Sequence, residues 1–172
     1  MSITTPKRSP ILTIVISAMM AALVAVATYI IQIPVPQTGG YINVGDAMIF
    51  TAALIFGPVI GGFAGGVGSA ISDLAGPYAH FAPVTLVVKG LEGLLVGFIS
   101  NKKTLWIEII AVIIGGAIMI SGYFLAEAFL MGYGIAAALV EVPGNLFQIT
   151  FGGIVGIPLS KAIRRFIPTL YR

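Results

Sequence analysis

The chain has 172 residues, of which 58% are hydrophobic and 9% are charged, and its formal net charge is +3. An average soluble domain is about 25% charged, and a soluble domain of this size has too little interior to bury so much apolar surface. The composition excludes a soluble enzyme, a disordered chain and a nucleic-acid-binding domain, so lipid is the expected solvent for most side chains. The absence of cysteine excludes disulfides, thiolate metal sites and cysteine nucleophiles.

Six apolar segments follow one another along the chain, and a membrane-spanning helix needs about 20 apolar residues. These segments are 11–33, 46–63, 64–74, 84–100, 105–131 and 143–163, and they form one integral membrane domain over residues 1–172. The second and third have no sharp boundary: Pro58 and the glycines after it favour a tight turn, but one long kinked segment fits the same residues. The sequence therefore predicts an all-α bundle of six transmembrane helices.

The first segment has a second interpretation as a signal peptide. Lys7 and Arg8 would form its basic region, and Ala25-Val26-Ala27 would form its cleavage site. The apolar region of a signal peptide is shorter than this segment, whose apolar run continues past Ala27. We therefore favour a transmembrane helix.

Basic residues near the ends of the spans predict the orientation in the membrane, because they concentrate on the cytoplasmic side. With six spans and a cytoplasmic N-terminus, eight of the nine basic residues fall inside: Lys7, Arg8, Lys102, Lys103, Lys161, Arg164, Arg165 and Arg172. The ninth, Lys89, lies within a span. The prediction is that both termini lie in the cytoplasm, with the chain in the cell membrane.

The remaining polar residues collect in the outer half of the predicted bundle. They are Asn43, Asp46, Asp73, His80, Lys89, Glu92, Glu127, Glu141, Asn145 and Gln148. Charged groups at membrane depth are costly and usually face a cavity or a partner. Several aromatic residues share this half, so the pattern favours an outward-facing pocket for a small molecule. A proton wire or an ion pore would need polar groups through the inner half too.

Each polar residue also has a purely structural interpretation. Lys89 and Glu92 are three residues apart on one helix and could neutralise each other. Asp46 follows Gly45 and suits the first turn of a helix, which we favour over ligand contact. Asn145 and Gln148 share a helix face, and for this pair we favour ligand contact.

The other polar residues are weighed in the same way. His80 is more often a loop residue than a metal ligand, and no second histidine exists to complete a zinc site. Glu127 needs a partner because a lone buried carboxylate is expensive, and Lys89 and His80 are candidates. Glu108 is the one residue of this kind that falls in the inner half of the predicted bundle, and we expect it at the cytoplasmic interface with Lys102 or Lys103.

Two enzyme interpretations are weak. Ser69 or Ser72 with His80 could form an intramembrane Ser–His pair, but the residues around Ser69 lack the usual nucleophile context. The glycine-rich run from Gly61 to Gly68 lacks the Lys-Ser/Thr pair and preceding strand of a phosphate-binding loop. Energy for uphill transport would therefore have to come from another chain.

Four motifs together carry a family resemblance. They are Tyr41-Ile-Asn-Val-Gly-Asp46 after an Ile-Pro-x-Pro segment; Gly57-Pro58 with the glycine-rich run to Asp73; Ala82-Pro-Val-Thr-Leu-Val-Val-Lys89-Gly-Leu-Glu92-Gly93; and Glu141-Val-Pro-Gly-Asn145-Leu-Phe-Gln148. From about Ala18 to Pro158 the chain resembles the substrate-binding S component of energy-coupling factor (ECF) transporters. The resemblance is strongest to the branch for hydroxymethylpyrimidine, pyridoxine-type and riboflavin substrates.

The resemblance implies a six-helix bundle whose outward pocket is capped by the loop after the first span. It implies, as partners, a transmembrane T component and two ABC-type ATPases, with the T component docking on Ala18 and Ala22. It also implies ligand contacts by position at Asn43, Lys89, Glu92, Glu127, Asn145 and Gln148, and we add His80 as a candidate.

The resulting hypothesis is the high-affinity binding subunit of an ECF-type ABC importer for a water-soluble vitamin or precursor. A pyrimidine or pyridine compound is favoured over riboflavin. We expect no enzymatic activity, no cofactor and no metal. The alternatives are a self-sufficient proton-coupled carrier and, less favoured, an intramembrane hydrolase.

Overall fold

The computed structural model describes residues 9–102 and 104–166. Six α-helices, one β-hairpin and two short helical segments follow one another in this part of the chain. Their bounds are α1 Pro10–Ile30, β1 Ile33–Val35, β2 Gly40–Ile42, α2 Asp46–Phe56, α3 Pro58–Ala75, α4 Ala82–Ile99, η1 Ser100–Lys102, α5 Leu105–Leu125, η2 Ala126–Leu130 and α6 Ile135–Phe166.

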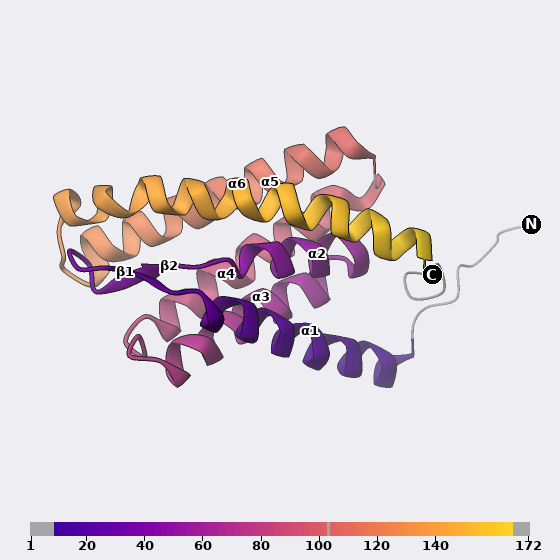
Figure 1. The fold of residues 1–172 in the computed structure, drawn as a ribbon, viewed down its shortest axis with the longest axis horizontal. Coiled ribbons are helices and arrows are strands. Elements are labelled where there is room, and N and C mark those ends of the chain that lie inside the picture. Colours follow the sequence, from indigo (N-terminus) through magenta and orange to yellow (C-terminus); the bar gives the residue numbers. More distant parts are fainter. Residues whose placement is uncertain (1–8, 103, 167–172) are drawn as a thin grey trace, which may run out of the picture.

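The helices run back and forth between two ends of an elongated bundle (Figure 1). The hairpin, the α3–α4 connection and the α5–α6 connection lie together at the left-hand end of that view. The start of α1, the α4–α5 connection and the end of α6 lie at the opposite end. Helix α3 packs between α1 and α4, while α2 packs on α6, and α5 packs on both α4 and α6.

Helix α1 begins and ends where the sequence chemistry requires. Pro10 occupies its first turn, and the Ser9 hydroxyl accepts a hydrogen bond from the Leu12 N–H at 3.2 Å. The helix ends at Ile30, three residues before the expected boundary, because Pro34 disfavours helical backbone at the residue before it. The chain then turns back through the hairpin, in which Ile33 pairs with Ile42 and Val35 with Gly40.

The break between α2 and α3 lies at Gly57, seven residues before the expected boundary at Ala64. Gly57 has φ of +92°, which glycine adopts without a steric penalty, and Pro58 starts the next helix. The two segments are therefore separate antiparallel helices rather than one long kinked helix. The glycines beyond Pro58 lie inside α3, where those from Gly61 to Gly66 face α4 and Gly68 faces α1.

The end of α5 and the start of α6 also differ from the expected spans. The chain leaves α5 through a wider turn, in which the Met131 N–H donates to the Ala126 carbonyl at 2.7 Å. Gly132 and Gly134, both with positive φ, complete the connection. Helix α6 then starts at Ile135, two turns before Pro143, and Pro143 lies inside it. Glu141, expected in a loop, is therefore a helical residue.

Glu108 is fully buried at the opposite end from the hairpin, and its partners come from α6. It pairs with the guanidinium of Arg164, and its Oε2 lies 3.9 Å from the Lys161 Nζ. The Arg164 Nη1 also donates to the Leu54 carbonyl at 3.1 Å. The end of α6 therefore returns to the start of α5 and supplies two cations to Glu108. The expected partners do not bear on this, because Lys103 and the side chain of Lys102 lie outside the described part of the chain.

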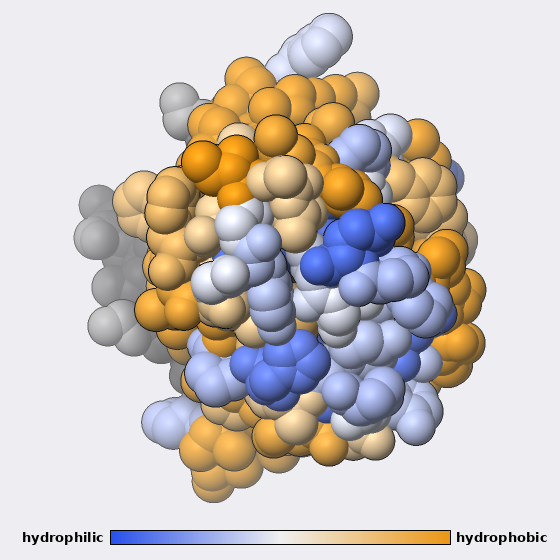
Figure 2. Space-filling model, turned by 90° about the vertical axis from the view of Figure 1, so that its left-hand side faces the viewer, coloured by the Kyte–Doolittle hydropathy of each residue, from blue (hydrophilic) through white to orange (hydrophobic). Residues whose placement is uncertain are grey.

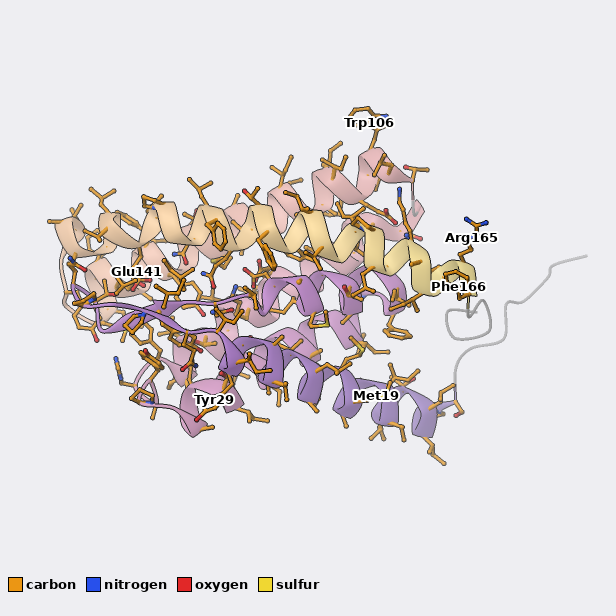
Figure 3. All side chains as sticks on the ribbon, viewed as in Figure 1. Met19, Tyr29, Trp106, Glu141, Arg165 and Phe166 are labelled. Atoms are coloured by element: carbon orange, nitrogen blue, oxygen red, sulfur yellow. The ribbon has the colours of Figure 1, made fainter. Side chains whose placement is uncertain are left out.

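Within residues 9–102 and 104–166, four helical stretches are long and apolar enough to cross a membrane: α1, α4, α5 with η2, and α6. Large apolar side chains such as Ile11 and Phe98 remain exposed around the bundle, as expected for lipid contact. The core lies between the helices and includes Ile16, Val24, Ile49, Phe50, Leu54 and Met119. Two exposed aromatic residues mark opposite ends, Tyr29 near the hairpin and Trp106 at the start of α5 (Figure 3).

Candidate ligand-binding site

A narrow polar cavity lies inside the bundle, below the hairpin. The free space at its centre is about 20 Å³, room for about one water molecule. The face that carries the hairpin is hydrophilic at its centre and apolar around it (Figure 2). The lining residues are Thr28, Gly40, Tyr41, Asn43, Ser69, Asp73, Phe81, Thr85, Lys89, Tyr123, Glu141, Asn145 and Gln148.

The short connection between β2 and α2, which bends and turns at residues 43–45, forms part of the wall. Non-helical backbone within a membrane is tolerated only where protein or a cavity satisfies its polar groups. The Asn43 N–H donates to the Gln148 Oε1 at 2.9 Å, and the Gly45 N–H donates to the Asn43 Oδ1 at 2.9 Å. The Gln148 Nε2 in turn donates to the Asn145 Oδ1 at 2.8 Å. These amides therefore hold the β2–α2 connection against α6, in addition to lining the cavity.

Lys89 lies at the centre of a buried charge cluster. Its ammonium pairs with the Asp46 carboxylate and lies 3.1 Å from the Glu92 Oε2. The three side chains are at most 2% exposed. Lys89 and Glu92 therefore form the ion pair that the structural interpretation predicted. Asp46 is the first residue of α2, as expected, and its carboxylate also binds the Lys89 ammonium. Two carboxylates therefore face one cation.

Aromatic residues form a second part of the wall. The Tyr41 hydroxyl donates to the Asp73 Oδ1 at 2.6 Å, and the Tyr41 ring lies 4.1 Å from the Tyr78 ring. Burial and the neighbouring Asp73 raise the pKa of the Tyr41 phenol, so it remains a hydrogen-bond donor at neutral pH. On the α5 side, the Tyr123 hydroxyl donates to the Thr85 Oγ1 at 3.1 Å.

Glu141 connects the hairpin to α6. Its carboxylate accepts a hydrogen bond from the Thr38 hydroxyl, and that hydroxyl accepts one from the Gly40 N–H at 3.2 Å. Figure 3 shows Glu141 between α6 and the hairpin. The carboxyl of Glu127 neighbours Glu141 and meets no hydrogen-bond donor in the described part of the chain. The expected partners of Glu127, Lys89 and His80, are therefore not its partners.

Three buried polar atoms on the α1–α3 side of the cavity have no hydrogen-bond partner within residues 9–102 and 104–166. They are the Thr28 Oγ1, the Ser69 Oγ and the Asp73 Oδ2. The sequence interpretation did not assign these residues to the ligand. The signal available was their spacing, because Ser69 and Asp73 are four residues apart and share one face of α3.

The predicted site residues separate into two groups. Asn43, Lys89, Asn145 and Gln148 come together around the cavity, from β2–α2, α4 and α6. Glu92, Glu127 and His80 are not among its lining residues. Glu92 contacts the cavity residue Lys89 but does not line the cavity itself. His80 is exposed, and its ring lies 4.7 Å from the Phe81 ring.

Metal ligands are not grouped in the part of the chain that the structure describes. No set of three or more histidine, aspartate or glutamate side chains there is arranged to hold an ion. The polar groups of the cavity are amides, hydroxyls, phenols, carboxylates and one ammonium, which suit hydrogen bonding to an organic ligand.

An apolar helical bundle with an enclosed polar cavity at one end defines a membrane protein that binds a small polar molecule. Residues 8–165 match the family described as "ECF-type riboflavin transporter, S component", and the chain belongs to that family. It is therefore the substrate-binding membrane subunit of an ECF-type transporter, and the resemblance in the sequence is confirmed.

Individual relatives agree with the family. Over 145 residues the chain is 41% identical to a Pyrococcus woesei protein named "Uncharacterized protein in gap 3'region", covering 84% of this chain and 96% of that protein. It is 28% identical to the "Thiamine precursor transporter HmpT" of Lactococcus lactis, covering 86% and 85% respectively. A "UPF0397 protein" of Streptococcus agalactiae is 32% identical over 52% of this chain and 48% of its own length.

Proposed function

We propose that this subunit captures a water-soluble vitamin or vitamin precursor outside the cell for import. The single observation that carries the proposal is the enclosed cavity, with polar groups from five helices and the hairpin, in a chain of the ECF S-component family. The aromatic rings of Tyr41, Phe81 and Tyr123 suit a flat heterocycle, and the amides and carboxylates suit its polar edge.

A pyrimidine or pyridine compound is favoured over riboflavin. The free space is close to that of one water molecule, so any ligand must displace side chains or the hairpin. One six-membered ring requires less displacement than the three fused rings of a flavin. The similarity to the thiamine precursor transporter supports the same choice.

The proposed topology has six spans across the cytoplasmic membrane, with both termini in the cytoplasm. Supporting it, Lys102, Lys161, Arg164 and Arg165 belong to the bundle end opposite the hairpin. Lys7, Arg8, Lys103 and Arg172 lie outside the described residues. In this orientation the cavity and hairpin face the outside.

The proposed partners are a transmembrane T component and two ABC-type ATPases. The family supports this, and α1 offers a surface for docking. Ala18 and Ala22 lie one turn apart and are exposed, whereas Ala21 is buried. Small residues at this spacing let a second helix approach closely.

Purified protein screened against water-soluble vitamins and precursors by native mass spectrometry and thermal shift tests the proposal. We expect one compound to bind with a Kd below about 1 µM, which corresponds to about −8 kcal/mol. Failure of every compound to reach micromolar affinity would overturn it. Reconstituted protein alone should bind but not accumulate the ligand in liposomes, whereas accumulation would favour the alternative of a self-sufficient proton-coupled carrier.

The intramembrane hydrolase is the weaker alternative. The Ser72 hydroxyl accepts a hydrogen bond from the Gln32 Nε2 at 3.4 Å, and the exposed His80 packs on Phe81. A hydrolase would lose activity on Ser72→Ala or His80→Ala and would show no high-affinity vitamin binding. The proposed importer should keep tight binding in Ser72→Ala.

A further inference from the structure

The α1–α3 wall of the cavity contains a carboxylate oxygen without a hydrogen-bond partner among the described residues, although the Thr85 side chain neighbours the same carboxylate. Asp73 is 1% exposed, and its Oδ1 accepts the Tyr41 hydroxyl at 2.6 Å. Its Oδ2 meets no donor, although Asp73 lines the cavity. A buried acceptor without a donor is costly, so a donor supplied by the ligand would gain a strong hydrogen bond there.

Two hydroxyls lie on the same side and are also unpartnered in the described residues. Ser69 precedes Asp73 by one turn of α3, and Thr28 comes from α1; both side chains are buried and both line the cavity. A hydroxyl donates and accepts, so it can meet either a ring nitrogen or a ligand hydroxyl. Three unsatisfied groups from two helices thus converge on one wall.

The charges around the cavity disfavour an anionic ligand. Lys89 is the only lysine or arginine among the lining residues, and Asp46 and Glu92 already hold its ammonium. The remaining charged groups of the lining, Asp73 and Glu141, are acidic. A phosphate group entering this cavity would meet no unpaired cation among the described lining residues and would lose its hydration.

We propose that Asp73, Ser69 and Thr28 form a subsite for an amino group on a heteroaromatic ring, and that the cavity rejects oxo and phosphorylated counterparts. The inference rests on the proposed function and names the substrate class. An exocyclic amino N–H would donate to the Asp73 Oδ2, while an adjacent ring nitrogen would accept from a hydroxyl. An oxo oxygen in the same place would face the Asp73 Oδ2, and two hydrogen-bond acceptors repel each other.

The test is calorimetric titration of the purified full chain with three probes. These are a 4-amino-5-hydroxymethylpyrimidine, its 4-oxo counterpart and the phosphate ester of the amino compound. We expect the amino compound to bind the wild-type protein at least about 10-fold more tightly than either of the others, because sites built around a hydrogen bond reject analogues that cannot make it. This comparison requires no variant.

The variant Asp73→Asn then tests whether Asp73 causes the preference for the amino compound over the oxo compound. The introduced amide can still accept from Tyr41 through its oxygen, but it presents an N–H to the cavity, so the preference for amino over oxo should fall at least about 10-fold or reverse. Ser69→Ala should weaken binding of the amino compound about 3- to 10-fold, the loss of one hydrogen bond. The matched control is Ile71→Ala on the same helix, at an exposed position outside the cavity lining, which should keep the wild-type preference.

Two results would overturn the inference. One is equal binding of the oxo compound or the ester to the wild type, and the other is an undiminished amino preference in folded Asp73→Asn protein. High-affinity binding of another vitamin, such as riboflavin, without binding of the aminopyrimidine would overturn this inference but leave the proposed function intact. Absence of binding by any vitamin or precursor would overturn both.

Discussion

At the scale of single residues, Lys89 joins two carboxylates in the polar half of the bundle. Its ammonium lies between the carboxylates of Asp46 on α2 and Glu92 on its own helix. A buried ion pair contributes little net stability, but removal of one partner leaves a charge without compensation. Lys89 therefore stabilises the contact between α2 and α4, because its charge compensates the two carboxylates that are buried there.

Lys89→Met should reduce the free energy of unfolding by about 3–5 kcal/mol, because Asp46 and Glu92 would remain buried without a cation. Thermal unfolding in detergent measures the effect. The control is the triple variant Lys89→Met, Asp46→Asn, Glu92→Gln, which removes all three charges and should recover more than half of the loss. Equal melting of wild type and Lys89→Met would show that the cluster is not structural.

Asn145 is the amide best placed for ligand contact. Its Oδ1 accepts from Gln148, and the side chain lines the cavity. Asn145→Ala should weaken ligand binding about 5- to 30-fold, as the loss of one or two buried hydrogen bonds predicts, while membrane insertion is unchanged. Asn101→Ala, at an exposed position at the opposite end, is the control. Wild-type affinity in Asn145→Ala would assign this residue to structure alone.

At the scale of elements, the contact between α3 and α4 positions both sides of the cavity. A Cβ at Gly65 would lie 2.5 Å from the Lys89 carbonyl oxygen, and one at Gly66 would lie 2.6 Å from the Leu86 carbonyl oxygen. The two backbones can approach this closely only because α3 has glycine there. The same approach sets Asp73 of α3 and Lys89 of α4 around one cavity.

Gly65→Ala should destabilise the bundle by about 1–3 kcal/mol, because the added methyl group would meet the backbone of α4. Gly90→Ala on the facing helix is the matched control. Its Cβ would lie 3.6 Å from its nearest neighbour, an ordinary contact, so this change should be neutral or stabilising by up to about 1 kcal/mol. Melting temperatures that fall equally in both variants would contradict the packing argument.

The order of the helices could be read from hydropathy, but several of their ends could not. The change to α3 depends on positive φ at Gly57, and the early start of α6 depends on the turn at Gly132 and Gly134. Hydropathy does not distinguish such a glycine from one that packs inside a helix. The helices therefore follow the order of the apolar segments, whereas Glu141, expected in a loop, lies inside α6.

Part of the candidate site was predictable because charged and polar residues are rare in this chain and are therefore conspicuous in its apolar segments. Lys89 and Asn145 stood out as polar residues in apolar segments, and both line the cavity. Pairings between distant segments were not predictable: Glu108 pairs with Arg164, fifty-six residues away, and Glu127 neighbours Glu141. Thr28 and Ser69 were missed because small hydroxyls also occur at ordinary helix contacts.

At the scale of the whole molecule, the hairpin end of the bundle is polar at its centre and the surface around it is apolar (Figure 2). The hydrophilic patch lies on the hairpin end, and apolar surface surrounds it (Figure 2). On the circumference, α1 carries the exposed Ala18 and Ala22 away from the cavity. Binding of the ligand and docking of a partner helix therefore use separate surfaces and should be separable by mutation.

Ala18→Trp should abolish uptake by cells that contain the complete transporter, because the large ring would prevent close approach of the T component. Ligand affinity of the purified subunit should not change. Leu23→Trp, at another exposed position of α1, is the control and should retain uptake. Normal uptake in Ala18→Trp would remove the docking proposal.

The shortness of α2 has a consequence for biogenesis. Its eleven residues extend only about 16 Å at 1.5 Å per residue, against a hydrocarbon core of about 30 Å, and nine of the eleven are buried. Such a segment is a poor independent substrate for the insertion machinery. It is expected to enter the bilayer together with α3 as a helical hairpin, after the Gly57 turn has been synthesised. The charge cluster at Asp46 would then be completed late, when α4 delivers Lys89.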